Sequence, residues 1–92
     1  MSDDVRLTAW VHGRVQGVGF RWWTRCRALE QGLTGYAANQ SDGRVLVVAN
    51  GPREAGERLL ELLRGDSTPG RVDKVVADWS EPTEQFTGFV ER

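Results

Sequence analysis

The sequence predicts an α+β fold in which two helices pack on one face of a β-sheet, with the elements in the order βαββαβ. Three observations carry this prediction: an alternating apolar pattern near the start, a helical apolar repeat after a glycine-rich stretch, and a hairpin signal in the middle of the chain. The chain has 92 residues, the size of one domain. We therefore expect a single domain over residues 1–92, with residues 1–4 as a flexible N-terminus.

The first half of the chain predicts a strand, a loop and a helix. Every second residue of 5–12 is apolar, as in a half-buried strand. Residues 13–19 hold three glycines, which end that strand. Residues 20–31 contain no Gly or Pro and predict a helix that Gly32 closes. The apolar residues expected to face the core from this helix are Trp22, Cys26, Leu29 and Leu33.

The second half predicts a hairpin, a helix and further strands. The turn Gln40-Ser41-Asp42-Gly43 separates apolar segments at 35–39 and 44–49, which indicates a β-hairpin. A second helix follows, with Pro52 at its first position and Gly65 at its end. Residues 72–79 predict a further strand, and residues 86–90 are a weaker candidate for a short last one. This order is the ferredoxin-like arrangement, so we expect a four- to five-stranded antiparallel sheet.

The predicted topology brings two distant segments together. A right-handed crossover makes the strands on either side of the first helix parallel, so both strands end at the same edge of the sheet. The loop at 14–21 follows the first of these ends, and Asn39 lies at the second. We therefore expect residues 14–21 and Asn39 to be neighbours in space.

Charge and composition exclude several classes of protein. The formal net charge of −1 argues against a dedicated nucleic-acid binder. The longest apolar run, Val45–Ala49, is far short of the roughly 20 residues of a membrane span. One cysteine and one histidine offer neither an intramolecular disulfide nor a metal-ligand cluster, so we expect no metal and no cofactor. The acidic start has no signal-peptide pattern, which favours a cytoplasmic location.

The charges are unevenly distributed, and the excess of positive charge surrounds the glycine loop. Residues 5–29 contain five arginines and no acidic residue, whereas the rest carries seven basic and thirteen acidic residues. The loop leads into a helix N-terminus, where free backbone N–H groups and the helix dipole favour an anion. The positive charge of Arg21 is unfavourable at the positive end of that dipole, and Arg25, one turn later, repels Arg21. A bound phosphate would make both interactions favourable. Alternatively, Arg21 caps a neighbouring strand and the loop is only a tight turn.

The run Val11-His12-Gly13-Arg14-Val15-Gln16-Gly17-Val18-Gly19-Phe20-Arg21 resembles the signature of the acylphosphatases, which hydrolyse the carboxyl–phosphate bond of acyl phosphates. Asn39-Gln40-Ser41-Asp42-Gly43 matches the second motif of that family. The resemblance also covers the second helix, the start of the next strand and Trp79. It implies an acyl phosphate substrate and inorganic phosphate as a product, without metal. Glu91 departs from the pattern, since an apolar residue is common there.

The resemblance also implies a role for particular residues. Backbone N–H groups of the loop would hold the phosphate, the guanidinium of Arg21 would bind its oxygens, and the side-chain amide of Asn39 would orient the attacking water. The implied catalytic residues are Arg21 and Asn39, and the implied phosphate-binding residues are Val15, Gln16, Gly17, Val18, Gly19, Phe20 and Arg21. A carboxylate leaving group, whose conjugate acid has a pKa of about 4, needs no strong general acid.

The main expectation is an enzyme that acts as a monomer, without membrane or nucleic-acid partners. Two other functions remain open. The chain could be an acylphosphatase-like binding or regulatory domain that catalyses nothing. An RNA-recognition domain shares the βαββαβ order, but it needs stacking aromatics on its central strands, and residues 44–49 have none. Asp42 is either a turn former or an acid catalyst. Arg14, Arg25 and Arg27 either steer an anionic substrate or solvate a helix face.

Overall fold

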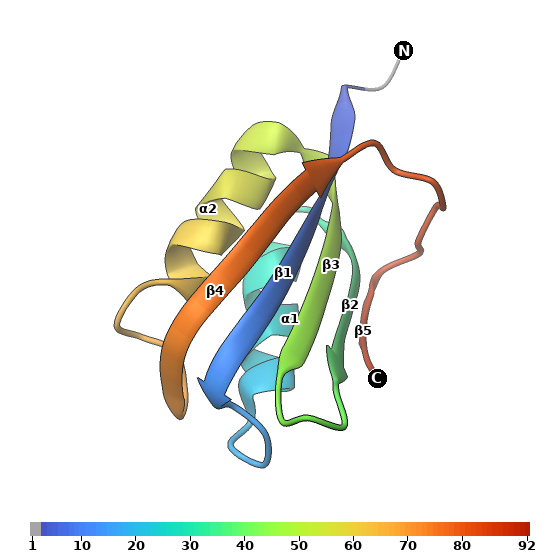
Figure 1. Cartoon of the computed structure of the whole chain (residues 1–92). Coiled ribbons are helices and arrows are strands. Elements are labelled where there is room, and N and C mark those ends of the chain that lie inside the picture. The colour runs from blue at the N-terminus through green and yellow to red at the C-terminus, as the bar shows by residue number, and fades with distance from the viewer. Residues whose placement is uncertain (1–2) are drawn as a thin grey trace.

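The computed structural model describes residues 3–92 and has the predicted order of elements, including the short last strand for which residues 86–90 are the weaker candidate (Figure 1). The expected flexible N-terminus covers residues 1–4, and residues 1 and 2 lie outside the described residues. Asp4 belongs to the sheet, since it pairs with Pro52. The elements are β1 (Asp4–Arg14), α1 (Phe20–Glu30), β2 (Thr34–Asn39), β3 (Val45–Pro52), α2 (Arg53–Leu63), β4 (Arg71–Ser80) and β5 (Phe89–Glu91). Within the described range, neither helix has the length and apolar character that a membrane span requires.

The five strands form one mixed sheet in the order β4-β1-β3-β2-β5. The prediction of an antiparallel sheet is right for β1, β2, β3 and β4 but wrong for β5, which pairs with β2 in parallel. The reason is the connection after β4. It crosses from one edge of the sheet to the other and lays Phe89 beside Gly35, so that β5 runs in the direction of β2 (Figure 1).

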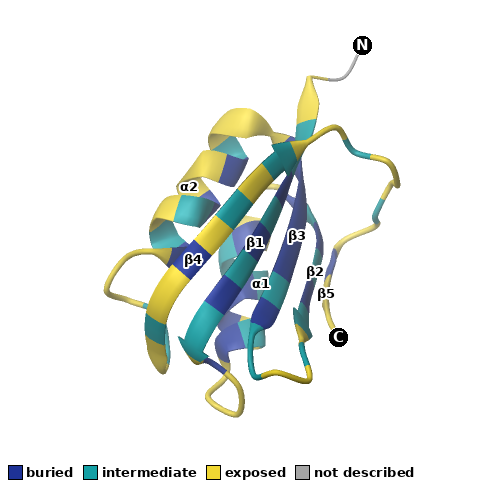
Figure 2. Ribbon diagram, in the orientation of Figure 1, coloured by how far each residue is buried: buried dark blue, intermediate teal, exposed yellow. Residues whose placement is uncertain are grey.

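Both helices cover one face of the sheet, and the core lies between these two layers (Figure 2). The alternation predicted for the first strand is confirmed, because Leu7, Ala9 and Val11 are fully buried. Leu59 and Leu63 of α2 are also fully buried. Gly56 lets α2 approach the sheet, since a Cβ at this position would lie 2.8 Å from the Trp79 ring.

The face that α1 turns toward the core differs from the predicted one. Trp22 is 59% exposed and Leu29 is 43% exposed, so these two residues of the predicted stripe face solvent. Cys26 is half-buried, and Leu33, which follows the helix, is buried as predicted. Phe20, at the start of α1, is 1% exposed and sets the rotation of the helix. Trp22 lies about 200° around the axis from Phe20, since each residue turns a helix by about 100°. The buried residues of α1 are Phe20, Trp23, Thr24 and Ala28.

Candidate functional site

The loop between β1 and α1 is held by its two ends. Val15 and Phe20 are each 1% exposed and pack in the core. The residues between them, 16–19, are all exposed at the surface. Burial of an apolar side chain at each end therefore anchors the loop, while its backbone stays accessible to a ligand.

Two glycines give this loop its backbone shape. Gly17 and Gly19 have φ angles of 75° and 81°, in the left-handed region that other residues adopt only at a cost. Gly19 is also the N-cap of α1, and no side chain caps the helix there. The first turn contains no acidic residue. Its free N–H groups thus remain available, as expected for an anion-binding helix start.

The guanidinium of Arg21 lies beside the loop and uses one of its nitrogens for the fold. Arg21 Nη1 donates a hydrogen bond of 2.7 Å to the carbonyl oxygen of Arg92. Among the described residues, no Asp or Glu side chain forms an ion pair with Arg21. This contact with the residue after β5 is the strand capping that the alternative interpretation expected for Arg21. Its other nitrogens leave the charge and several donors free for an anion.

Asn39 ends β2 next to Arg21, and the two residues share an acceptor. The backbone N–H of Asn39 donates to the Arg92 carbonyl oxygen at 3.1 Å, the same atom that Arg21 contacts. Asn39 is exposed, and its side-chain amide makes no hydrogen bond to any described residue. The structure therefore brings Arg21 and the end of β2 together, with the amide of Asn39 open to solvent.

The predicted proximity of the glycine loop to the end of β2 is confirmed by direct contacts. Gln16 Nε2 donates to the carbonyl oxygen of Gln40 at 2.7 Å and to that of Arg44 at 3.0 Å. This side-chain bridge and the role of Arg92 as the acceptor for Arg21 were not predicted from the sequence. All three acceptors are main-chain oxygens, which every residue has, so the residue types do not reveal which of them accept these hydrogen bonds.

The remaining arginines of the positive segment divide into structural and free cations. Arg25 Nε donates to the Phe89 carbonyl oxygen at 2.9 Å and so fastens β5 to α1. Arg27 pairs with Glu30 at 2.9 Å. Arg14 is exposed, and its side chain has no partner among residues 3–92. Of the three arginines considered for steering, the geometry leaves Arg14 as the one available for it.

Asp42 stabilises the turn that follows Asn39. Its Oδ1 accepts a hydrogen bond of 3.1 Å from the Arg44 backbone N–H, and its Oδ2 lies 2.6 Å from Arg44 Nε. The backbone hydrogen bond, with help from the guanidinium, lowers the pKa of the Asp42 carboxyl below its ordinary value of 3.8. Asp42 is therefore ionised at neutral pH, which suits a turn former and not an acid catalyst.

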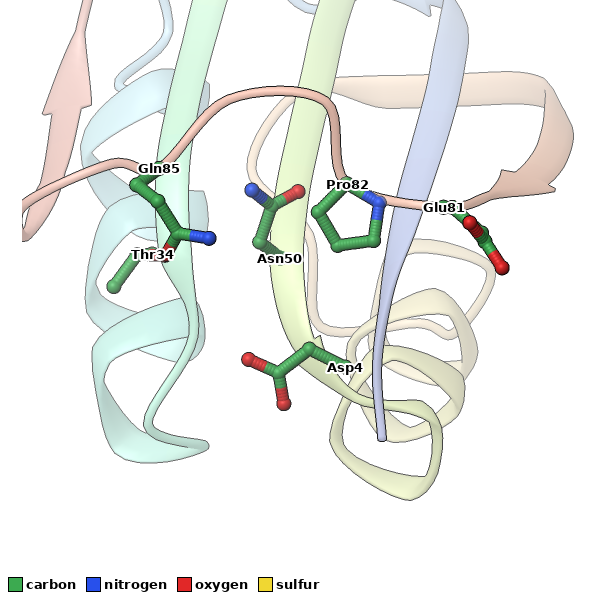
Figure 3. Close-up of a pocket in the computed structure, with 6 residues that line it drawn as sticks. All are labelled: Asp4, Thr34, Asn50, Glu81, Pro82 and Gln85. Carbon is green, nitrogen blue, oxygen red and sulfur yellow. The ribbon is translucent and has the colours of Figure 1, made fainter. Parts of the chain in front are cut away.

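A separate pocket of about 250 Å³ lies at the opposite end of the sheet (Figure 3). Its lining contains the carboxylates of Asp4 and Glu81 and no basic side chain, so it does not suit an anion. The Asn50 amide, labelled in Figure 3, donates to the Glu84 carbonyl oxygen at 2.9 Å and accepts from Arg6 at 3.0 Å. These bonds fasten the connection between β4 and β5 to the sheet, which is a structural role.

Known proteins resemble this chain over nearly its whole length. The family model described as Acylphosphatase matches residues 7–90. The chain is 82% identical to an acylphosphatase of Mycobacterium avium strain 104 over an alignment of 95 positions, which covers 99% of this chain and 98% of the relative. The crystal structure of acylphosphatase from Bacillus subtilis matches with a TM-score of 0.87 at 31% identity, covering 96% of this chain and 98% of that one.

A second solved structure, an acylphosphatase from Coxiella burnetii, matches with a TM-score of 0.82 at 36% identity and covers 98% of this chain and 94% of its own. The matched region includes both strands that end at the site, the glycine loop and the turn after β2. On this combination of sequence and fold, the chain belongs to the acylphosphatase family.

Proposed function

We propose that this protein hydrolyses the carboxyl–phosphate bond of acyl phosphates, with the phosphoryl group bound at residues 15–21 and the attacking water oriented by Asn39. The observation that carries the proposal is the convergence of Arg21 and Asn39 on the Arg92 carbonyl oxygen, beside a loop with free N–H groups. This arrangement provides positive charge for a phosphoryl group and an amide for a water molecule within one small region.

The phosphoryl group binds through the backbone and one side chain. Gly17 and Gly19 adopt left-handed angles, which are the angles that turn successive backbone N–H groups of a loop toward one anion. Arg21 adds a planar guanidinium that bonds two phosphate oxygens at once. Its contact with Arg92 holds the guanidinium in place before the substrate arrives. A site organised in this way stabilises the charge of the transition state without rearranging.

The hydrolysis step needs little beyond this positioning. A water molecule held by the Asn39 side-chain amide attacks phosphorus, and the bond from phosphorus to the carboxyl oxygen breaks. The electron pair of that bond leaves with the carboxylate, and the protons of the water remain with the phosphate and the solvent. Because the leaving carboxylate is the base of an acid with a pKa of about 4, it needs no protonation and no metal.

The protein acts in this proposal as a single domain and a monomer in the cytoplasm, without metal, cofactor, membrane or nucleic-acid partners. All the proposed site residues belong to one chain, so the proposed reaction requires no residue from a second copy. The unpaired thiol of Cys26 suits a reducing compartment. Size-exclusion chromatography with light scattering tests the oligomeric state.

The experiment that tests the function is hydrolysis of benzoyl phosphate by the purified protein in the presence of a chelator. We expect turnover well above the uncatalysed rate, with inorganic phosphate as a competitive inhibitor. Phosphate binding without turnover would favour an acylphosphatase-like binding domain instead. Turnover that requires an added divalent ion would contradict the metal-free mechanism.

A further inference from the structure

The side chain of Gln16 joins the glycine loop to the turn after β2. Its amide nitrogen donates one hydrogen bond of 2.7 Å to the Gln40 carbonyl oxygen and another of 3.0 Å to the Arg44 carbonyl oxygen. These two carbonyls lie at the base of the turn, where the Gln40 backbone N–H also donates to Arg44 at 2.8 Å. No other hydrogen bond within residues 3–92 connects residues 15–19 with residues 40–44.

The amide of Gln16 suits this bridge for a geometric reason. A primary amide nitrogen carries two N–H groups that diverge, so that one nitrogen serves two separate acceptors. The bridge spans 24 residues of sequence to Gln40 and 28 to Arg44. It is exposed, and water competes for both groups, so the bridge contributes little to the stability of the fold. Its main effect is to set the distance between two loops.

Asn39 lies between two fixed points. Its own N–H is held by the Arg92 carbonyl oxygen, the atom that also orients Arg21. The carbonyl of the next residue, Gln40, is held by Gln16. The Arg92 contact relates Asn39 to the guanidinium, and the Gln16 contact relates it to the loop that presents N–H groups. Together with the pairing of Asn39 with Val45, these contacts hold the backbone from which the Asn39 side chain extends.

We propose that Gln16 is a positioning residue, whose side chain holds the Asn39 amide at the correct distance from the phosphoryl group. This inference rests on the proposed function and adds to it, because the side chain of Gln16 touches neither substrate nor water in this scheme. A misplacement of about 1 Å in a catalytic group costs on the order of 100-fold in rate. Loss of the bridge therefore reduces turnover while the phosphate loop itself persists.

The test compares Gln16→Met, which keeps the length of the side chain and removes both donors, with Gln31→Met. Gln31 is the C-cap of α1, at the far end of that helix from the loop, and its side chain makes no hydrogen bond to a described residue. We expect Gln16→Met to lower kcat for benzoyl phosphate by about 10- to 100-fold. The inhibition constant of inorganic phosphate and the midpoint of thermal unfolding should change little. Gln31→Met should leave all of these values unchanged.

A double-mutant cycle separates positioning of Asn39 from a general effect on the loop. If Gln16 acts through Asn39, the Asn39→Ala substitution reduces kcat much less in the Gln16→Met background than in the wild-type protein. Full additivity overturns the proposal, as does an unchanged kcat in Gln16→Met. A loss of phosphate affinity as large as the loss of kcat also overturns it, because Gln16 would then hold the loop and not Asn39.

One readout does not depend on activity. In the ¹⁵N-labelled, phosphate-saturated protein, the side-chain amide signals of Asn39 should shift or broaden in Gln16→Met and stay in place in Gln31→Met. Unchanged Asn39 signals in Gln16→Met overturn the proposal. A wild-type protein that fails to hydrolyse benzoyl phosphate refutes the proposed function, while these signals still decide whether Gln16 positions Asn39.

Discussion

Arg21 and Asn39 donate to one and the same atom, the carbonyl oxygen of Arg92, at 2.7 and 3.1 Å. One donor comes from the first turn of α1 and the other from the end of β2, and the acceptor follows β5. Three elements that are distant in sequence thus meet at a single point. Arg21, proposed to bind the phosphoryl group, and Asn39, proposed to orient the water, are therefore linked through a backbone oxygen and make no direct hydrogen bond to each other.

Replacement of Arg21 with alanine should weaken phosphate binding and turnover together. Two charge-assisted hydrogen bonds of roughly 1.5–3 kcal/mol each are lost, which gives about 3–6 kcal/mol in transition-state stabilisation. Arg14→Ala serves as the control, since it removes an exposed cation near the loop that has no described partner. Kinetics and phosphate titration measure both variants. Equal effects of the two substitutions would show that Arg21 contributes only general positive charge.

The Asn39→Ala variant should lose turnover and keep phosphate. The side-chain amide is exposed and makes no hydrogen bond to a described residue, so its removal leaves the loop and Arg21 intact. The backbone N–H that donates to Arg92 is retained in alanine. Isothermal titration with inorganic phosphate, run beside the hydrolysis assay, separates binding from catalysis. Loss of phosphate binding would be incompatible with a role in orienting water.

Gly19→Ala should combine a loss of stability with a loss of phosphate binding. The backbone at Gly19 has φ 81°, and an alanine in the left-handed region costs about 1–2 kcal/mol, although no atom lies within 4 Å of the added Cβ. Gly88→Ala is a matched control, because Gly88 has φ 71° and equally open space but lies outside the loop. Urea unfolding should report similar destabilisation in the two variants. Phosphate affinity should fall only in Gly19→Ala.

The two adjacent tryptophans of α1 should differ sharply in their effect on stability. Trp23 is buried and packs against Phe20, so Trp23→Ala should destabilise the fold by about 3–5 kcal/mol. Trp22 is 59% exposed, and Trp22→Ala should change the free energy of unfolding by less than about 1 kcal/mol, within a range usual for surface substitutions. Chemical denaturation measures both. The reverse ranking would mean that the observed rotation of α1 is wrong.

The stability of the fold should fall in acid in part through Asp42. The pKa of its carboxyl is lowered in the folded protein, chiefly by the Arg44 backbone N–H, so the ionised form favours folding. This contribution is fully present above the ordinary pKa of 3.8 and is lost as the pH falls through the lowered value. Thermal unfolding curves of the wild-type protein and Asp42→Asn should therefore converge as the pH is lowered. A gap that widens in acid would contradict this sign.

Much of the fold could be predicted because local patterns and tertiary packing agree. The alternation in β1 matches its buried residues, and the turn at 40–43 joins two strands as expected. The neighbourhood of the glycine loop and the end of β2 followed from topology alone. Those parts of the prediction depend on the apolar periodicity, which the residue types give directly, and on the right-handed crossover, which is general to protein chains.

The parts that failed depend on information that residue types do not carry. The stripe through Trp22 has the same helical period as the buried face, and the burial of Phe20 in the core decides between the two faces. The direction of β5 depends on the path of the connection from residue 81 to residue 88. The Arg21 contact and the Gln16 bridge end on carbonyl oxygens, which leave no trace in the sequence.

The position of the Arg92 carbonyl has a practical consequence for making the protein. Any residues joined after Arg92, such as a purification tag, would emerge directly beside Arg21 and Asn39, next to the short pairing of β5 with β2. The first described residues lie at the opposite end of the molecule, where β1 begins (Figure 1). A tag placed before residue 1, or one that a protease removes from behind Arg92, is therefore kept away from the proposed active site.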